Sequence, residues 1–264
     1  MTSELLSELG AGGVLRLTMN RPEVHNAFDD AQIERLSEAI AAAADNPEVR
    51  LLVLAGSGKS FSAGADLAWM QRMAEYDYGH NMKDAEQLAG MLNALFDLTQ
   101  PTIARVQGAA FGGAVGLVSC CDMAVGTPRA AFALSEVKIG LIPATISPYV
   151  IRAIGERAAR RFFTTGERFD ADTALRLGLL SEVVADDELD AGVSNLVEAV
   201  LANGPLAVRA AKDLVGSVAG QPLDHALIED TCARIAHIRV SEEGQEGLQA
   251  FLQKRAPAWQ RKED

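Results

Sequence analysis

Phe61-Ser62-Ala63-Gly64-Ala65-Asp66-Leu67 is the stretch that decides the fold, together with a second one further along the chain, Gly108-Ala109-Ala110-Phe111-Gly112-Gly113-Ala114. Each places small residues where a strand is expected to turn into a helix. Small side chains leave backbone N–H groups bare and let a ligand approach closely. Two such groups from separate loops can converge on one oxygen atom, which is the construction of an oxyanion hole. The alternative is a pair of tight turns in a close-packed α/β core.

A third segment supplies one carboxylate: Leu134-Ser135-Glu136-Val137-Lys138-Ile139-Gly140-Leu141-Ile142-Pro143. A carboxyl group in a dry site can carry a proton between two carbon atoms, or between water and carbon. Burial would raise its pKa toward the useful range. Glu136 is therefore the candidate acid/base, and the alternative is a solvated loop glutamate.

Strands and helices are expected to alternate as far as Val184, which indicates an α/β fold class. Strands are predicted at 14–19, 51–55, 101–106, 123–125 and 131–134. Helices are predicted from Asp29 or Asp30 onward, at about 81–98 and at 113–121, with residues 70–80 irregular. After Asp186 three or four helices are expected, with starts at Gly204-Pro205, Gln221-Pro222 and Ser241-Glu242.

The composition is ordinary for a globular protein: of 264 residues, 48% are hydrophobic and 23% are charged. A net charge of −12 argues against a nucleic-acid partner, because phosphate binding needs clustered Lys and Arg. Cys120, Cys121 and Cys232 show no disulfide framework, so we expect buried, reduced thiols. The acidic N-terminus has no apolar core and no run is long enough to span a membrane, so we expect a cytoplasmic protein without a membrane partner.

Several common motifs fail at specific residues. Gly56-Ser57-Gly58-Lys59-Ser60 resembles the end of a phosphate-binding loop, but the leading glycine position holds Val53. The chain contains neither G-x-G-x-x-G nor G-x-S-x-G, and its four histidines lack metal-ligand spacing. We therefore expect no nucleotide hydrolysis, hydride transfer or serine hydrolysis, and neither a metal nor a redox cofactor.

The three segments, in this order and spacing, resemble the enoyl-CoA hydratase/isomerase (crotonase) family. Further matching pieces are Asn20-Arg21-Pro22 with Asn26-Ala27, Cys121-Asp122, Thr165-Gly166-Glu167-Arg168-Phe169 and Lys254-Arg255. The resemblance covers nearly the whole chain. It implies a crotonase-like spiral of ββα units over residues 1–200, followed by a helical oligomerisation region over residues 201–264. In the family this region builds a trimer, and two trimers often form a hexamer.

The resemblance also implies roles for individual residues. The N–H groups of Ala65 and Gly113 would donate to the thioester oxygen of an acyl-CoA, and Glu136 would carry the proton. Coenzyme A would be part of the substrate rather than a cofactor. The residues expected to bind substrate or CoA are Ala63, Gly64, Asp66, Leu67, Gly112, Gly116, Arg21, Phe251 and Lys254.

Some of these roles have plain alternatives. Phe251 and Lys254 would reach a CoA on a neighbouring subunit, but Lys254-Arg255 also fits a solvated helix end. Arg21 would lie near the pyrophosphate, or it belongs to a simple turn. Trp69, Met70 and Met73 would shape the acyl pocket, or they are core residues.

One position departs from the hydratase pattern. Hydratases of the family usually carry a second glutamate three residues after the oxyanion glycine, where this chain has Gly116, and no Asp or Glu lies between Pro101 and Cys121. One carboxylate suffices to move a proton between two carbons, as family isomerases do, whereas hydration needs an oriented water. A substrate carboxylate, Ser119, Tyr149 or a backbone carbonyl would have to hold that water.

A closer resemblance favours hydration. Residues 62–70, 112–117, 119–122 and 144–150 look like the bacterial methylglutaconyl-CoA and carboxygeranoyl-CoA hydratase branch, which acts in leucine and acyclic terpene breakdown on branched substrates with a second carboxylate. We therefore predict an enoyl-CoA hydratase acting on a 2-enoyl-CoA such as 3-methylglutaconyl-CoA. The alternatives are a double-bond isomerase that uses the same glutamate, and a catalytically weak acyl-CoA-binding homologue.

Overall fold

The core of the computed structural model, which describes residues 3–260, is a six-stranded sheet in the order β1-β2-β3-β4-β6-β9. Its strands are β1 (Leu5–Gly10), β2 (Val14–Met19), β3 (Leu51–Gly56), β4 (Thr102–Val106), β6 (Met123–Gly126) and β9 (Glu182–Val183). β1 pairs antiparallel with β2, and every other neighbouring pair is parallel. The parallel strands direct their carboxyl ends toward one edge, where the loops of the site begin.

A smaller sheet lies in the order β5-β7-β8, made of β5 (Ala109–Phe111), β7 (Ala131–Ala133) and β8 (Arg168–Asp170). β5 and β7 are parallel, whereas β7 and β8 are antiparallel. β5 follows β4 in the chain and β7 follows β6, so each pass along the large sheet continues into the small one. This is the recurrence of ββα units that the family resemblance implies.

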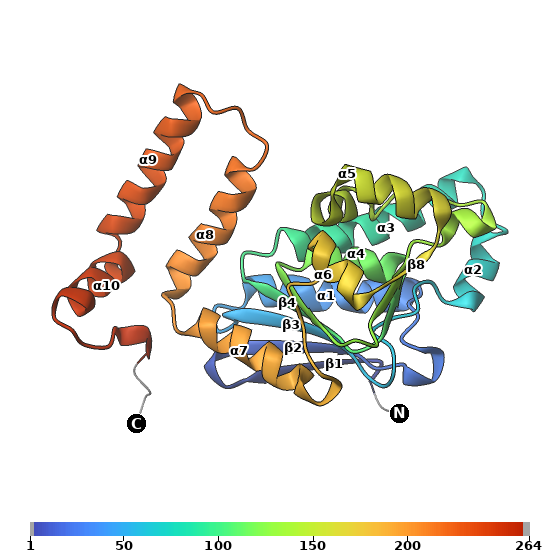
Figure 1. Cartoon of the computed structure of the whole chain (residues 1–264), viewed down its shortest axis with the longest axis horizontal. Coiled ribbons are helices and arrows are strands. Elements are labelled where there is room, and N and C mark those ends of the chain that lie inside the picture. Colours follow the sequence, from blue (N-terminus) through green and yellow to red (C-terminus); the bar gives the residue numbers. More distant parts are fainter. Residues whose placement is uncertain (1–2, 261–264) are drawn as a thin grey trace.

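Helices cover both faces of the large sheet (Figure 1). On one face, α1 (Asp30–Asp45) and α3 (Tyr78–Phe96) contribute to a core that includes Leu17 and Leu54. On the other face, α7 (Leu189–Leu201) packs on Val53 and its neighbours. Every residue of β3 is buried, as expected for a central strand covered on both sides.

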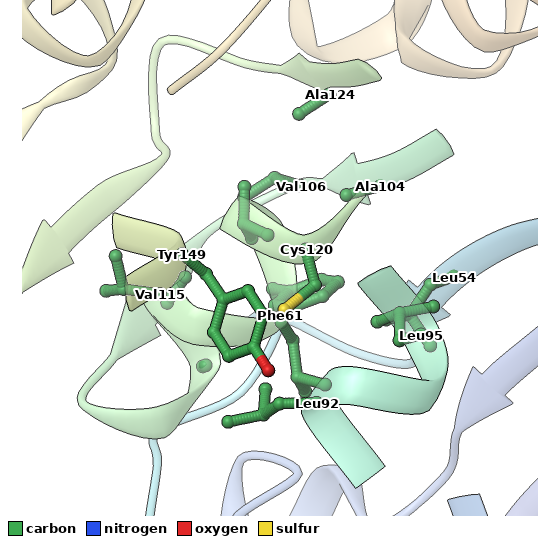
Figure 2. Close-up of a cluster of buried hydrophobic side chains, with 14 of the residues drawn as sticks. Leu54, Phe61, Leu92, Leu95, Ala104, Val106, Val115, Cys120, Ala124 and Tyr149 are labelled. Atoms are coloured by element: carbon green, nitrogen blue, oxygen red, sulfur yellow. The ribbon is translucent and has the colours of Figure 1, made fainter. Parts of the chain in front are cut away.

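The main core extends between α4 (Gly113–Cys120) and α5 (Ser147–Thr165). Figure 2 shows Tyr149 of α5 beside Val115 and Cys120 of α4 and close to Leu92 of α3. α4 is almost entirely apolar and buried, so its axis is fixed by packing on all sides. The remaining helices of the core are α2 (Leu67–Met73) and α6 (Ala171–Leu177).

The C-terminal helices form an arm that extends away from the core (Figure 1). They are α8 (Pro205–Val218), α9 (His225–Val240) and α10 (Glu242–Leu252). Lys212 of α8 binds Asp122 with Nζ and Oδ2 2.7 Å apart, and Arg209 donates to the carbonyl of Val49 at 2.8 Å. The predicted division of the chain at residue 200 stays a prediction, and its outer limits, residues 1–2 and 261–264, lie outside the described residues.

Most of the predicted elements are confirmed, with specific exceptions. Residues 70–80 are not irregular throughout: α2 and α3 begin at Leu67 and Tyr78 because Asp66 and Asp77 cap their first turns. The short strands β1, β5, β8 and β9 were not predicted. Cys232 is exposed on α9, so the expectation that all three thiols are buried is wrong.

Among residues 3–260 no single helix has the length and hydropathy of a membrane span. The segments Asp186–Leu201 and Pro205–Val218 meet that test only as a pair, with a bend of 104° between them.

Candidate active site

The loop that carries Ala65 is held by the segment just before α1. The amide of Ala63 donates to the carbonyl of His25 at 2.9 Å, that of Phe28 to Gly64 at 2.9 Å, and that of Asp66 to Phe28 at 3.0 Å. These bonds form a parallel bridge between Phe28 and Ala65. Successive peptide groups of an extended chain point to opposite sides, so the N–H of Ala65 turns away from Phe28. Within residues 3–260 that N–H has no hydrogen-bond acceptor.

The second loop ends at the start of α4. Gly112 has φ 55° and ψ −124°, a conformation that only glycine adopts readily, and its amide donates to Ala133 at 2.8 Å. Gly113 is the first residue of the helix, where N–H groups have no intrahelical partner and the helix dipole is positive. The Gly113 N–H is left without an acceptor in the described part of the chain.

The two loops lie against each other through Gly64 and Phe111. Ser62 and Ala110 form a parallel bridge, in which Ser62 donates to Ala109 and Phe111 donates to Ser62, each at 3.1 Å. Gly64 has φ 89°, and a Cβ there would stand 2.7 Å from the carbonyl oxygen of Phe111. Glycine is therefore required at position 64 for the loops to approach this closely.

Glu136 begins a 3₁₀ turn, Glu136–Ile139, next to the second loop. A Cβ built on Gly112 would lie 3.3 Å from Glu136 Oε1, so the carboxyl group stands against the Gly112 backbone. Its other oxygen, Oε2, is buried without a hydrogen-bond partner in the described residues. Burial raises the pKa of Glu136 above its ordinary value, and a backbone hydrogen bond offsets only part of this effect. The structure thus places a carboxyl group that is partly shielded from water beside the start of α4.

Gly116 lies one turn further along α4 and is packed rather than open. A Cβ there would stand 2.4 Å from Ile146 Cγ2 and 3.5 Å from Leu92 Cδ2. Ile146 is 1% exposed and belongs to the main core. The space that a second glutamate would need is therefore occupied by Ile146.

An ion pair between Arg21 and Asp66 connects the segment before α1 to the loop that carries Ala65. Arg21 Nη2 lies 3.0 Å from Asp66 Oδ2, and Nη1 lies 3.3 Å from Asp29 Oδ2 and 3.0 Å from the carbonyl oxygen of Ala27. Burial alone would raise the pKa of Asp66, but the amides of α2 and the Arg21 guanidinium together lower it. The Arg21 side chain is thus engaged with carboxylates, and the structure does not direct it to an open site.

The other expected pocket residues lie in different surroundings. Leu67 is 76% exposed at the start of α2, whereas Trp69 is buried in the core and donates from Nε1 to Asp84 at 3.1 Å. Met70 and Met73 are half-buried, and Met73 packs against the core. This favours the core alternative for Trp69.

Tyr149 and Ser119 are the two side chains considered for holding the attacking water, and in the described residues neither forms a hydrogen bond with Glu136. The Tyr149 hydroxyl lies 3.5 Å from Asn93 Oδ1, and Ser119 Oγ is buried without a partner among the described residues.

Phe251 belongs to α10 and Lys254 follows that helix, and the arm that α10 is part of lies apart from α2 and α4 (Figure 1). Phe251 is 82% exposed at the end of α10, and Lys254 follows with φ 53°. One chain alone does not bring these two residues to Glu136. In the described residues no group of three or more His, Cys, Asp and Glu side chains is arranged to hold a metal ion.

Three residues of the site had no role assigned from the sequence. Asn26 Nδ2 donates to the carbonyl oxygens of Ser57 and Ser60 at 2.8 and 2.9 Å, and so holds the loop that leads to Ala63. The Asn26-Ala27 pair, which matches the family pattern, was the signal in the sequence that could have identified Asn26. Ile146 lies in the segment 144–150 that resembles the hydratase branch, but nothing in the sequence gave Ile146 or Phe28 an individual role, because an apolar residue in a loop is indistinguishable from any other core residue.

Comparison with known proteins gives consistent results. A family model described as Enoyl-CoA hydratase/isomerase matches residues 10–262. A putative enoyl-CoA hydratase of Thermus thermophilus is 34% identical over 248 residues, which is 93% of this chain and 97% of that protein. A putative enoyl-CoA hydratase/isomerase (crotonase) from Legionella pneumophila superposes with a TM-score of 0.94 at 46% identity, covering 98% of this chain and 100% of that one.

A second solved structure, an enoyl-CoA hydratase from Shewanella pealeana, gives a TM-score of 0.94 at 46% identity, with coverage of 97% and 96%. Likeness at this level confirms the predicted fold class, including the helical region after the α/β core.

Proposed function

Because the chain belongs to the enoyl-CoA hydratase/isomerase family, we propose that it hydrates a 2-enoyl-CoA thioester, with Ala65 and Gly113 as oxyanion donors and Glu136 as the acid/base. The observation that supports this most directly is the position of Glu136, whose half-buried carboxyl group stands against Gly112 at the start of α4. A thioester oxygen bound by the Gly113 N–H would place its α and β carbons near that carboxyl group.

The chemistry follows from where negative charge develops. As water adds to the β carbon, the C=C electron pair moves toward the thioester carbonyl and the oxygen becomes enolate-like. Fixed N–H donors stabilise that oxygen, and the loss of one such donor costs about 3–4 kcal/mol. Glu136 takes the proton that the water loses and returns a proton to the α carbon, so one hydrogen and one hydroxyl are added overall.

The proposed substrate is branched and carries a second carboxylate, as in 3-methylglutaconyl-CoA. A single protein carboxylate has to orient the water without the usual partner, since Ile146 fills the space beside Gly116. A carboxylate on the substrate would supply the missing acceptor for the second water proton. The apolar surroundings of Gly116 are compatible with this division of roles.

The packing of Ile146 against Gly116 also favours a second candidate, double-bond isomerisation. Moving a proton from one carbon to another needs one carboxylate and no water. A dry apolar contact at position 116 would keep water away from the conjugated product, so that the product is not hydrated. In that case Glu136 would take a proton from the α carbon of a 3-enoyl-CoA and deliver it to the γ carbon, which moves the double bond into conjugation with the thioester.

The helical arm is proposed to build a trimer, or a dimer of trimers. Apolar side chains are exposed on all three of its helices, including Val215 (69%), Val240 (77%) and Leu252 (77%). Burying such side chains between subunits would stabilise the assembly. In that assembly Phe251 and Lys254 would reach the CoA of a neighbouring subunit.

One assay separates the candidates. Purified protein is mixed in turn with a linear 2-enoyl-CoA, a 3-enoyl-CoA and 3-methylglutaconyl-CoA, and the absorbance of the conjugated thioester is followed. Loss of conjugation supports hydration, and a gain from the 3-enoyl substrate supports isomerisation. No change with any substrate, together with retained CoA binding, would reduce the protein to an acyl-CoA-binding homologue and overturn the proposal.

A further inference from the structure

Phe28 contacts both loops that carry the proposed oxyanion donors. Its backbone forms the bridge to Ala65 through the bonds Phe28 N–Gly64 O at 2.9 Å and Asp66 N–Phe28 O at 3.0 Å. Its ring points at the start of α4: a Cβ on Gly113 would stand 2.5 Å from Phe28 Cζ and 3.1 Å from Cε2. One residue therefore contacts the Ala65 loop with its main chain and Gly113 with its side chain.

The contacts of Phe28 leave it little freedom. It is 2% exposed, and the next residue, Asp29, caps α1 by accepting from the amide of Gln32 at 2.9 Å. Arg21 donates to the carbonyl of Ala27, the residue before it, at 3.0 Å. A ring held in a close-packed core transmits its position to its neighbours, because interiors have few voids into which it could move.

We infer that Phe28 is a positioning residue that sets the separation of the Ala65 and Gly113 amides, an inference that rests on the proposed function. The bridge fixes Ala65 relative to the Phe28 main chain, and the ring tip fixes how closely Gly113 approaches. A smaller side chain at position 28 removes the second constraint and leaves the first intact. The first residue of α4 then moves toward the space vacated by the ring, and its N–H no longer points at the oxygen that Ala65 binds.

The energetic consequence is a loss of catalysis without loss of binding. A misplacement of about 1 Å in a catalytic geometry can cost roughly a hundredfold in rate. The contacts proposed between CoA and residues 63–67 do not involve the Phe28 ring, so CoA binding is expected to be unaffected. We expect Phe28→Leu to lower kcat at least about tenfold while the dissociation constant for CoA changes less than about twofold.

A spectroscopic measurement separates positioning from general destabilisation. A saturated acyl-CoA labelled with ¹³C at the thioester carbonyl is bound to the protein, and the carbonyl chemical shift and stretching frequency are recorded. Wild-type protein should show a polarised carbonyl, and Phe28→Leu should show a weaker effect at saturating ligand. The matched control is Phe162→Leu, since Phe162 is buried to 3% exposure on α5 and packs on Phe169. It should lower stability and leave the carbonyl polarisation unchanged.

A reciprocal pair of variants tests the contact itself. Gly113→Ala should disturb α4 because the new Cβ would overlap the ring, and Phe28→Leu should restore room for it. The double variant is expected to recover kcat and polarisation relative to Gly113→Ala alone. Polarisation in Phe28→Leu equal to wild type, or no recovery in the double variant, would overturn the role of Phe28. An unpolarised carbonyl in wild-type protein would instead overturn the oxyanion donors of the proposed function.

Discussion

Ile146 lies directly over Gly116, so closely that a Cβ at position 116 would stand 2.4 Å from Ile146 Cγ2. The absence of a side chain at position 116 is therefore part of the packing between α4 and the start of α5, rather than an opening in the site. Gly116 and Ile146 together therefore leave the site with a single carboxylate. A glutamate at position 116 would fit only if the residue at position 146 changed as well.

Gly116→Ala is expected to destabilise the protein by about 1–3 kcal/mol, because an added methyl group overpacks a filled core. Gly90→Ala is the matched control, since Gly90 also lies inside a helix but a Cβ there meets nothing within 4 Å. It should be stabilising by about 0.5–1 kcal/mol through helix propensity. Urea unfolding of both variants measures the difference, and equal changes in the two would contradict the contact with Ile146.

A double-mutant cycle extends this test. Ile146→Ala alone should cost about 2–5 kcal/mol, and Gly116→Ala should cost less in that background than in wild type. Additive costs would mean that the two positions do not share the same space.

Glu136→Gln is expected to lower turnover at least about a hundredfold, because a positioned acid/base contributes roughly 10²–10⁴ in rate. The amide keeps the shape of the side chain, so CoA binding should be retained. In the isomerase reaction Glu136 must be ionised to accept a proton, and its raised pKa moves the acid limb of the rate profile to higher pH than an ordinary glutamate gives. Steady-state rates from acid to neutral pH measure that limb. Full activity of the glutamine variant would remove Glu136 from its role.

The same substitution should stabilise the folded protein at neutral pH. Burial raises the pKa of Glu136 in the folded state, so between the unfolded and folded values the folded chain holds a proton that the unfolded chain has released. The free energy of unfolding of the wild type therefore falls as the pH rises through that interval. The Glu136→Gln variant does not lose stability in this way. Its free energy of unfolding should therefore exceed that of the wild type only slightly below about pH 4.3, and by more at pH 8. Denaturant unfolding at both pH values tests the sign, with exposed Glu86→Gln as the control.

How far the site could be predicted depended on whether its signal was local. The start of α1 could be predicted to within one residue, at Asp29 or Asp30, and the start of α4 at Gly113, because capping and small-residue patterns act over a few positions. The family of the chain was likewise predictable from three local segments. Glu136 could be singled out by its surroundings in sequence, and its role as the acid/base stays a prediction.

The contacts that hold the site together could not be predicted in this way. Phe28 meets Gly113 and Ile146 meets Gly116 across long sequence separations, and nothing in a single sequence marks an apolar residue as the partner of a particular glycine. The strands β5, β8 and β9 were missed for a similar reason, since they are two or three residues long and are defined by their neighbours rather than by periodicity. α2 was missed because its seven residues give too short a pattern for helical periodicity.

Gly112→Ala should impair both folding and chemistry, and a second glycine allows the two effects to be separated. At φ 55° and ψ −124° an alanine is strained, which costs of order 1–3 kcal/mol, and its Cβ would also lie 3.3 Å from Glu136 Oε1. Gly155 has φ 76° and ψ 156°, also a glycine conformation, but a Cβ there meets nothing within 4 Å. Gly155→Ala should therefore lose stability and keep the activity of its folded fraction. Gly112→Ala should lose stability and, in addition, lower kcat of the folded protein, because the methyl group displaces the carboxyl group. Unfolding curves combined with rates normalised to folded protein measure both quantities, and an unchanged kcat in Gly112→Ala would show that Glu136 does not act from its position against that loop.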